Sequence, residues 1–272
     1  MTAGPAPTGR FRSGFVTLVG RPNVGKSTLL NAILGTKVSI VSDKPQTTRT
    51  QVRGVLNWRS ATHPDRPEAQ VVFVDTPGIH KPRTVAAERF NATARDALEG
   101  VDVVCFVFDA TAPFGRGDQF IAGRLKPEST ICVLNKIDLV PRQEVLRQLT
   151  RAAELDFAEY FPVSAVRGDG VAELVEAIVG RLPEGPRYYP EGMVTDVPDA
   201  FWVAELVREQ LLAVTREELP HSIACRVTEW EWPRIRCEIL VERESQKGIV
   251  IGRKGEVLKR VGTAVREQLD PG

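Results

Sequence analysis

A glycine-rich run near the start of the chain has the residue types needed to hold phosphate groups. Gly20, Gly25, Lys26 and Ser27 match the spacing G-x-x-x-x-G-K-S, directly after the apolar run 15–19 and before a helix-like segment. Glycines let backbone N–H groups wrap a phosphate, and a helix N-terminus adds positive partial charge. The Lys26 ammonium can reach the β- and γ-phosphates, which makes it a catalytic candidate, and the Ser27 hydroxyl can ligate Mg²⁺. The expected nucleotide-binding residues of this run are Gly20, Arg21, Pro22, Asn23, Val24, Gly25, Lys26, Ser27 and Thr28.

Three later motifs indicate that the nucleotide carries guanine. The motif D-T-P-G follows the apolar run 71–74, where Asp75 can hold the Mg²⁺ shell. Gly78, the second catalytic candidate, can turn its N–H toward a γ-phosphate. The motif N-K-I-D follows the apolar run 130–134, and the Asp138 carboxylate can accept the two neighbouring donors of guanine. A Ser-Ala pair after the run 160–163 would bring a backbone N–H to the guanine O6. These motifs add Asp75, Thr76, Pro77, Gly78, Asn135, Lys136, Asp138, Ser164 and Ala165 to the expected site.

The order and detail of these motifs resemble the GTPase superfamily, and within it the bacterial Era family of ribosome-associated GTPases. The resemblance rests on GRPNVGKST, QTTRT, DTPGIHKPR, NKID and SA, and it spans residues 15–270. It implies that Thr48, favoured over Thr47, closes over Mg²⁺ together with Ser27 and Asp75. Ile79 stands where Ras-like enzymes place a glutamine that orients the attacking water, so we expect slow intrinsic GTP hydrolysis. Asn23 implies, as a hypothesis, that potassium acts as an activator.

The apolar runs predict the fold class of the first part of the chain. They are continuous rather than alternating, as in strands buried on both faces of a parallel sheet, and helix-like stretches separate them. This alternation predicts an α/β P-loop domain with a mixed, mostly parallel sheet. We expect a flexible tail over 1–13, the GTPase domain over 14–182, a Pro- and Gly-rich linker over 183–198, and a second domain over 199–272.

The second domain has a different pattern, with a helix, two strand-like runs, and a loop Gly252-Arg253-Lys254-Gly255 between two helical pieces. A G-x-x-G loop is typical of KH domains, which clamp single-stranded RNA. Between residues 247 and 266 six basic residues face one acidic residue, as expected for contact with an RNA backbone. The expected RNA-binding residues are Ile251, Gly252, Arg253, Lys254, Gly255 and Lys259.

The order of elements resembles the α+β type II KH domain at the C-terminus of Era proteins. That arrangement implies a third strand after the last helix, whereas the sequence ends at Gly272. We therefore expect the last part of the KH domain to be missing. The resemblance also implies binding to small-subunit (16S) ribosomal RNA and a role in assembly and maturation of the 30S particle.

Composition sets limits on the other classes of function. The net charge of +1 gives no signal about partners, and no apolar run approaches the ~18 residues that a membrane span needs. We expect a cytoplasmic monomer with reduced thiols, and the family resemblance leaves weak peripheral association with the inner face of the cell membrane open. A GTPase of tRNA modification is the alternative, although the C-terminal cysteine and folate-type domain of that branch are not seen. A membrane-trafficking GTPase would need a lipidated or polybasic terminus, which is not visible either.

Overall fold

The protein is described from a computed structural model that covers all residues except 1–9, 43–51, 61–66, 76–99, 216–221 and 270–272. It divides into two compact units. The first holds residues 1–39 and 48–196, and the second holds residues 40–47 and 197–272. Each unit has its own hydrophobic core and is treated by itself.

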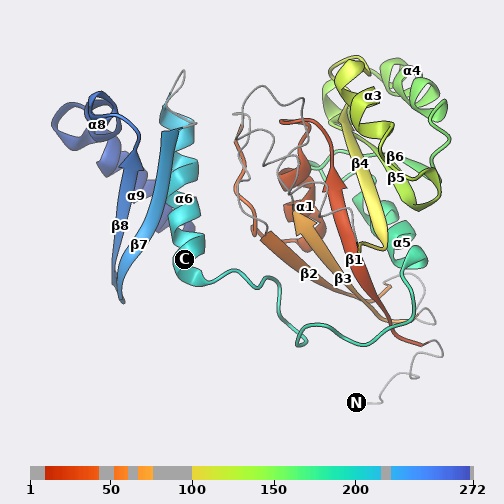
Figure 1. Ribbon diagram of the computed structural model, residues 1–272, viewed down its shortest axis with the longest axis horizontal. Coiled ribbons are helices and arrows are strands. Elements are labelled where there is room, and N and C mark those ends of the chain that lie inside the picture. The colour runs from red at the N-terminus through yellow and green to blue at the C-terminus, as the bar shows by residue number, and fades with distance from the viewer. Residues whose placement is uncertain (1–9, 43–51, 61–66, 76–99, 216–221, 270–272) are drawn as a thin grey trace. The chain divides into compact units, whose positions relative to one another are not determined.

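The first unit is built on a six-stranded sheet with the order β2-β3-β1-β4-β5-β6 (Figure 1). Strand β2 is antiparallel to β3, and the remaining neighbours are parallel. This is the mixed, mostly parallel sheet that the continuous apolar runs predict. The strands are β1 (Arg12–Val19), β2 (Val52–Trp58), β3 (Ala69–Asp75), β4 (Val103–Asp109), β5 (Thr130–Asn135) and β6 (Glu159–Pro162).

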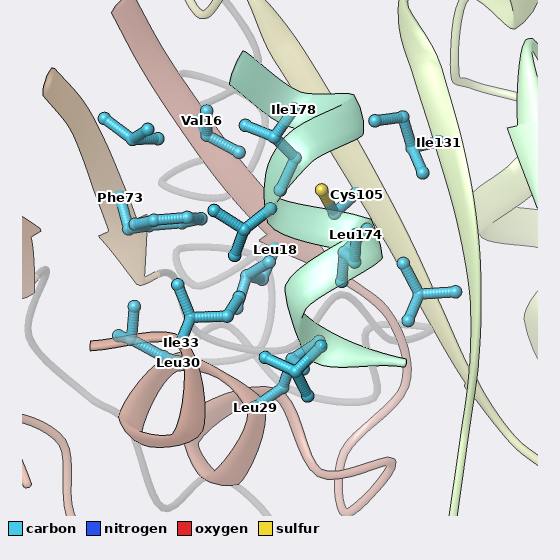
Figure 2. Close-up of a cluster of buried hydrophobic side chains, with 14 of the residues drawn as sticks. Val16, Leu18, Leu29, Leu30, Ile33, Phe73, Cys105, Ile131, Leu174 and Ile178 are labelled. Carbon is cyan, nitrogen blue, oxygen red and sulfur yellow. The ribbon is translucent and has the colours of Figure 1, made fainter. Parts of the chain in front are cut away.

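Helices cover both faces of this sheet, which is why its central strands are apolar throughout. Along β4, Val103, Cys105 and Val107 belong to one core cluster, and Phe106 and Phe108 belong to the other. The first cluster includes side chains of α1 and α5, and Figure 2 shows its buried residues packed together. The second cluster includes side chains of α3 and α4. The helices are α1 (Lys26–Leu34), α3 (Arg116–Ala122), α4 (Arg142–Ala153) and α5 (Val171–Arg181).

The stretch that the sequence marks as a linker is held against the first unit through residue 196. The Val55 N–H donates to the Val194 carbonyl at 2.7 Å, beside an isolated antiparallel bridge between Gly54 and Thr195. Gln70 of β3, fully buried, binds the backbone of Tyr188 and Tyr189. We call residues 183–196 the strap, because this stretch lies along the unit without forming a helix or a strand of its own.

The second unit contains two strands and three helices among its described residues, in the order that the KH resemblance implies. Strands β7 (Ile223–Glu231) and β8 (Arg234–Val241) form an antiparallel pair with a bulge between Val227 and Glu229. Apolar side chains of α6, β7, α8 and α9 form its core. The helices are α6 (Asp199–Val214), α8 (Glu244–Ile251) and α9 (Glu256–Leu269), with a 3-10 turn at Arg253–Gly255.

The four cysteines differ in how deeply they are buried. Cys105 and Cys132 are buried in the first unit, and burial raises the pKa of the Cys105 thiol to about 12. Cys225 and Cys237 are half-buried in the second unit. The strand pairing places both on the same face of the sheet, in diagonal positions, which sequence spacing alone does not reveal.

Candidate functional site

The phosphate-loop run 20–27 follows β1 and leads into α1, which begins at Lys26, as its sequence predicts. Asn23 and Gly25 adopt left-handed conformations, with φ of 65° and 95°, and Gly25 directly precedes α1. A Cβ atom at Gly20 would lie 2.1 Å from the Val107 carbonyl oxygen, so this position requires glycine. Lys26 is buried, and its ammonium donates to the carbonyls of Gly20 at 3.1 Å and Arg21 at 2.9 Å. The loop thus surrounds the Lys26 ammonium, the group expected to bind the phosphates.

The N-K-I-D segment holds the outer side of this loop. The Asn135 side-chain amide donates to the Val24 carbonyl at 3.0 Å, and the Lys136 ammonium donates to the Asn23 carbonyl at 2.7 Å. The Asn135 oxygen also accepts the Ala165 N–H at 3.1 Å, which ties in the Ser-Ala motif. Carbonyls that are held outward favour a loop whose N–H groups face inward, as an anion site needs.

Asp138 and Ser164 meet at the expected place for reading a base. The Ser164 hydroxyl donates to Asp138 Oδ1 at 2.7 Å and accepts the Arg167 N–H at 3.2 Å. Asp138 lies in the 3-10 turn Ile137–Leu139, directly after β5. The carboxylate therefore has a defined orientation, and its two oxygens suit the paired N–H donors of guanine.

Asp109, which belongs to none of the predicted motifs, stabilises Lys136. It ends β4 opposite Asn135 of β5, and it accepts the Lys136 ammonium at 2.6 Å and the Thr111 N–H and hydroxyl at 2.8 and 2.6 Å. Burial opposes the charged carboxylate, but the hydrogen bonds from Lys136 and Thr111 outweigh it and lower the pKa of Asp109. Its position at the end of an apolar run, like that of Asp75, was the available sequence signal.

The expected metal ligands are described in part. Ser27 lies in the first turn of α1, and Asp75 ends β3 beside Leu18 of β1, at the strand ends where the loop begins. The Ser27 hydroxyl is a hard oxygen donor of the kind that Mg²⁺ prefers, and the residue types at both positions fit this ion. The expected residues Thr48, Thr76, Pro77 and Gly78 lie outside the described residues, as does the side chain of Asp75.

The G-x-x-G run of the second unit forms a tight turn between α8 and α9. Gly252, Lys254 and Gly255 have positive φ values of 74°, 53° and 78°. A Cβ atom at Gly252 would lie 2.5 Å from Val257 Cγ2, so this glycine permits α9 to start close to the turn. The side chains of Ile251, Arg253, Lys254 and Lys259 are exposed. Arg253 and Lys254 on the exposed turn, with Ile251 at the end of α8 and Lys259 in the first turn of α9, are suited to a nucleic-acid backbone and its bases.

Comparison with protein families gives one match in each of the two units. Residues 15–136 match the family model described as 50S ribosome-binding GTPase, and residues 218–271 match the model of the KH domain. A GTPase Era of Carboxydothermus hydrogenoformans is 46% identical over 271 residues, which is 96% of this chain and 88% of the relative. The GTPase Era of Clostridium botulinum is 44% identical over 268 residues, with the same coverage. The chain belongs to the Era family of GTPases.

Solved Era structures share the fold. A crystal structure of Era in complex with MgGDPNP and nucleotides 1506–1542 of 16S ribosomal RNA is 41% identical, with a TM-score of 0.87 over 95% of this chain and 88% of that one. A variant of Aquifex aeolicus Era bound to GDP.AlF4- matches with the same identity, TM-score and coverage. The predicted fold class, a P-loop GTPase domain followed by a KH domain, is confirmed. Among the described residues, no helix has the length and apolarity to cross a membrane.

Proposed function

We propose that this Era-family GTPase is a switch that binds and hydrolyses GTP, binds small-subunit ribosomal RNA through its KH domain, and acts in assembly of the 30S subunit. The observation that carries the proposal is the joining, in one chain, of a loop clamped by Asn135 and Lys136 to an exposed G-x-x-G turn. The similar Era bound to MgGDPNP and a 16S RNA segment supports both ligands and the choice of RNA.

Guanine selection is assigned to Asp138, with Ser164 as its orienting partner. The Ser164 hydroxyl uses one lone pair of Asp138 Oδ1. The other lone pair of Oδ1 can accept one N–H donor of guanine, and Oδ2 can accept the second. Lys136 would lay its aliphatic stem along the base, because its ammonium is already fixed by Asp109 and the Asn23 carbonyl. The Ala165 N–H would lie near the guanine O6.

Phosphate binding and hydrolysis are assigned to Lys26 and the loop backbone. The Lys26 ammonium is held by two loop carbonyls, and we expect it to exchange them for β- and γ-phosphate oxygens. Ser27, Asp75 and Thr48 would hold Mg²⁺, which neutralises charge on the phosphates when bound. The Gly78 N–H would donate to the γ-phosphate. Because Ile79 cannot orient water, we expect slow intrinsic turnover.

Potassium activation remains part of the proposal. Asn23 lies at the left-handed turn of the phosphate loop, where its side-chain oxygen would hold a monovalent cation beside the phosphates. Such a cation would supply positive charge during phosphoryl transfer. GTP turnover should then be faster in potassium than in sodium at equal ionic strength, and equal rates would remove this part of the proposal.

The switch itself follows from the physics of phosphate-dependent loops. The γ-phosphate and Mg²⁺ would hold residues 36–50 and 76–90, of which 43–50 and 76–90 lie outside the described residues, and hydrolysis would release them. We further propose a cytoplasmic monomer with weak peripheral membrane association. Partition of the purified protein on anionic vesicles, measured by sedimentation, tests that last point.

The deciding experiment is binding of a short single-stranded RNA from the 3′ end of small-subunit ribosomal RNA, measured with GTP and with GDP. The test variant is Arg253→Gln with Lys254→Asn, because asparagine tolerates the positive φ of 53° at position 254. If both cations meet phosphates, the negative slope of log affinity against log salt should become less steep by about 1.4, at ~0.7 per phosphate contact with a single strand.

The matched control is Arg234→Gln, which also removes a positive charge from the second unit. Arg234 begins β8 at the hairpin end, whereas β8 leads at its other end to α8 and the G-x-x-G turn (Figure 1). The control should keep the RNA affinity and salt slope of the original protein much more closely than the test variant does. Because the control removes one charge and the test variant removes two, a loss in the control at least half as large as that in the test variant would show that net charge, rather than the G-x-x-G turn, carries the binding.

A further inference from the structure

The side chain of Arg21 is directed to a neighbouring helix, although the residue belongs to the phosphate loop. Its guanidinium Nε donates to Asp118 Oδ1 at 2.8 Å. Asp118 lies in the first turn of α3, 97 residues further along the chain. No sequence motif of the nucleotide site includes Asp118.

Asp118 is a fully buried carboxylate with both oxygens engaged. Its side chain is 0% exposed, and Oδ2 accepts the Gly115 N–H at 3.0 Å. A buried charge is costly unless an opposite charge and hydrogen bonds compensate it. Arg21 supplies that charge, so the folded state favours an Arg21 side chain that points to α3.

The first turn of α3 also provides space for the arginine. A Cβ atom at Gly117 would lie 2.7 Å from Arg21 Cδ and 3.5 Å from Arg21 Cγ. Glycine at 117 has no side chain to meet the stem, and Asp118 receives its end. Helix α3 thus holds Arg21 by shape as well as by charge.

This contact holds the first half of the phosphate loop. The Arg21 carbonyl accepts the Lys26 ammonium, so the backbone of Arg21 is part of the cradle while its side chain is anchored outside it. The second half of the loop is held separately, since Lys136 binds the Asn23 carbonyl and Asn135 binds the Val24 carbonyl. Anchors on both halves would keep the loop in its phosphate-binding shape before the nucleotide arrives.

We propose that Asp118 is a positioning residue for GTP and GDP, which acts by holding Arg21 and through it the first half of the phosphate loop. The proposal rests on the assignment of this loop as the nucleotide site. It predicts that loss of the carboxylate weakens binding of nucleotides in proportion to their contact with the loop. GDP, whose β-phosphate lies in the cradle, should be affected more than GMP.

The test uses the full chain and measures the dissociation constants of GDP and GMP by competition with a fluorescent guanine nucleotide. Asp118→Asn keeps an acceptor for the Gly115 N–H but removes the charge that binds Arg21. We expect GDP affinity to fall about tenfold and GMP affinity to fall less than about threefold, so that the GMP-to-GDP ratio changes. A purely structural role would lower both affinities by the same factor, through the folded fraction, and that result would overturn the proposal.

A second variant keeps the proposal testable if Asp118→Asn folds poorly. Gly117→Ala leaves both charges in place but puts a methyl group against the Arg21 stem, and it should also weaken GDP more than GMP. The double variant Arg21→Gln with Asp118→Asn should weaken GDP no more than the stronger single variant, because both changes break one contact. Additive losses would contradict the assigned route through Arg21.

The matched control is Glu159→Gln, which removes a different ion pair from the same unit. Glu159 begins β6 and binds Arg181 at 2.8 Å, whereas the phosphate loop follows the carboxyl end of β1. Because β6, β5, β4 and β1 are parallel, Glu159 lies where these strands begin, and the phosphate loop lies where they end. It should leave both dissociation constants unchanged. An original protein that bound no guanine nucleotide would instead overturn the nucleotide site itself, and this inference with it.

Discussion

Replacement of Gln70 by leucine should detach the strap from the first unit. Gln70 is fully buried in β3 and makes four hydrogen bonds. Its oxygen accepts the N–H groups of Tyr188 and Tyr189 at 2.8 and 2.9 Å, and its amide donates at 2.9 Å to the Tyr189 carbonyl and to Asn57 Oδ1. Leucine has a similar volume but can make none of these bonds.

The cost can be bounded from these contacts. At ~1 kcal/mol for each hydrogen bond, four bonds contribute about 4 kcal/mol. Strap groups that move into water regain partners there, so the measured loss should be smaller, and we expect the free energy of unfolding to fall by about 2–4 kcal/mol. Urea denaturation of the full chain measures this quantity.

Trypsin cleavage reports on the strap directly. Arg187 lies in the strap, paired with Glu68 at 3.1 Å, and cleavage after it yields fragments 1–187 and 188–272 that mass spectrometry identifies. In the Gln70→Leu variant this cut should become much faster under native conditions, because the opened strap presents an extended chain to the protease.

Gln148→Leu is the matched control for this experiment. Gln148 is a second buried glutamine of the same unit, bonded to Phe114, Ala112 and Glu144, none of which belongs to the strap. It should lose stability without faster cleavage after Arg187. If Gln70→Leu lost no more stability than about 0.5 kcal/mol, or was cut no faster than Gln148→Leu, the assignment of Gln70 as the strap anchor would be wrong.

Two further predictions concern the base and the ion pair behind it. Asp138→Asn should weaken GDP binding by about a hundredfold, which is the upper range for one bidentate base contact. It should improve binding of xanthosine diphosphate, because the carbonyl of that base can accept a hydrogen bond from the new amide. Competition binding with both nucleotides measures the shift, and an unchanged preference for GDP would refute the role of Asp138. The lowered pKa of Asp109 means that its contribution to stability is fully present above the ordinary aspartate pKa of about 3.9 and is lost as pH falls through the lower folded-state value. Asp109→Asn should therefore be less stable than the original protein at pH 7 and approach it in strong acid, as urea denaturation at several pH values would show; a constant difference across that range would contradict the ion pair with Lys136.

Much of the fold could be predicted from the sequence because the elements of this protein have strong local patterns. Continuous apolar runs mark β1, β3 and β5, and the loop motifs stand directly at their ends. The helix expected at the start of the second domain corresponds to α6, which ends at Val214. The Pro- and Gly-rich stretch 183–198 was harder to interpret, because composition excludes regular structure but does not say whether a chain is docked. Its contacts with Gln70 depend on a strand more than a hundred residues earlier.

By itself, the sequence determined which residues can do chemistry, since phosphate, guanine and RNA recognition need particular residue types at short spacing. G-x-x-x-x-G-K-S, N-K-I-D and G-x-x-G each act within one turn or loop, so their meaning is local. The tertiary structure decided which distant groups support them. Asp118 meets Arg21 across 97 residues and Asp109 meets Lys136 across 27, because the strand order and the packing of α3 bring these positions together. Such pairs have no fixed spacing in the chain, and only the folded sheet and its covering helices define them.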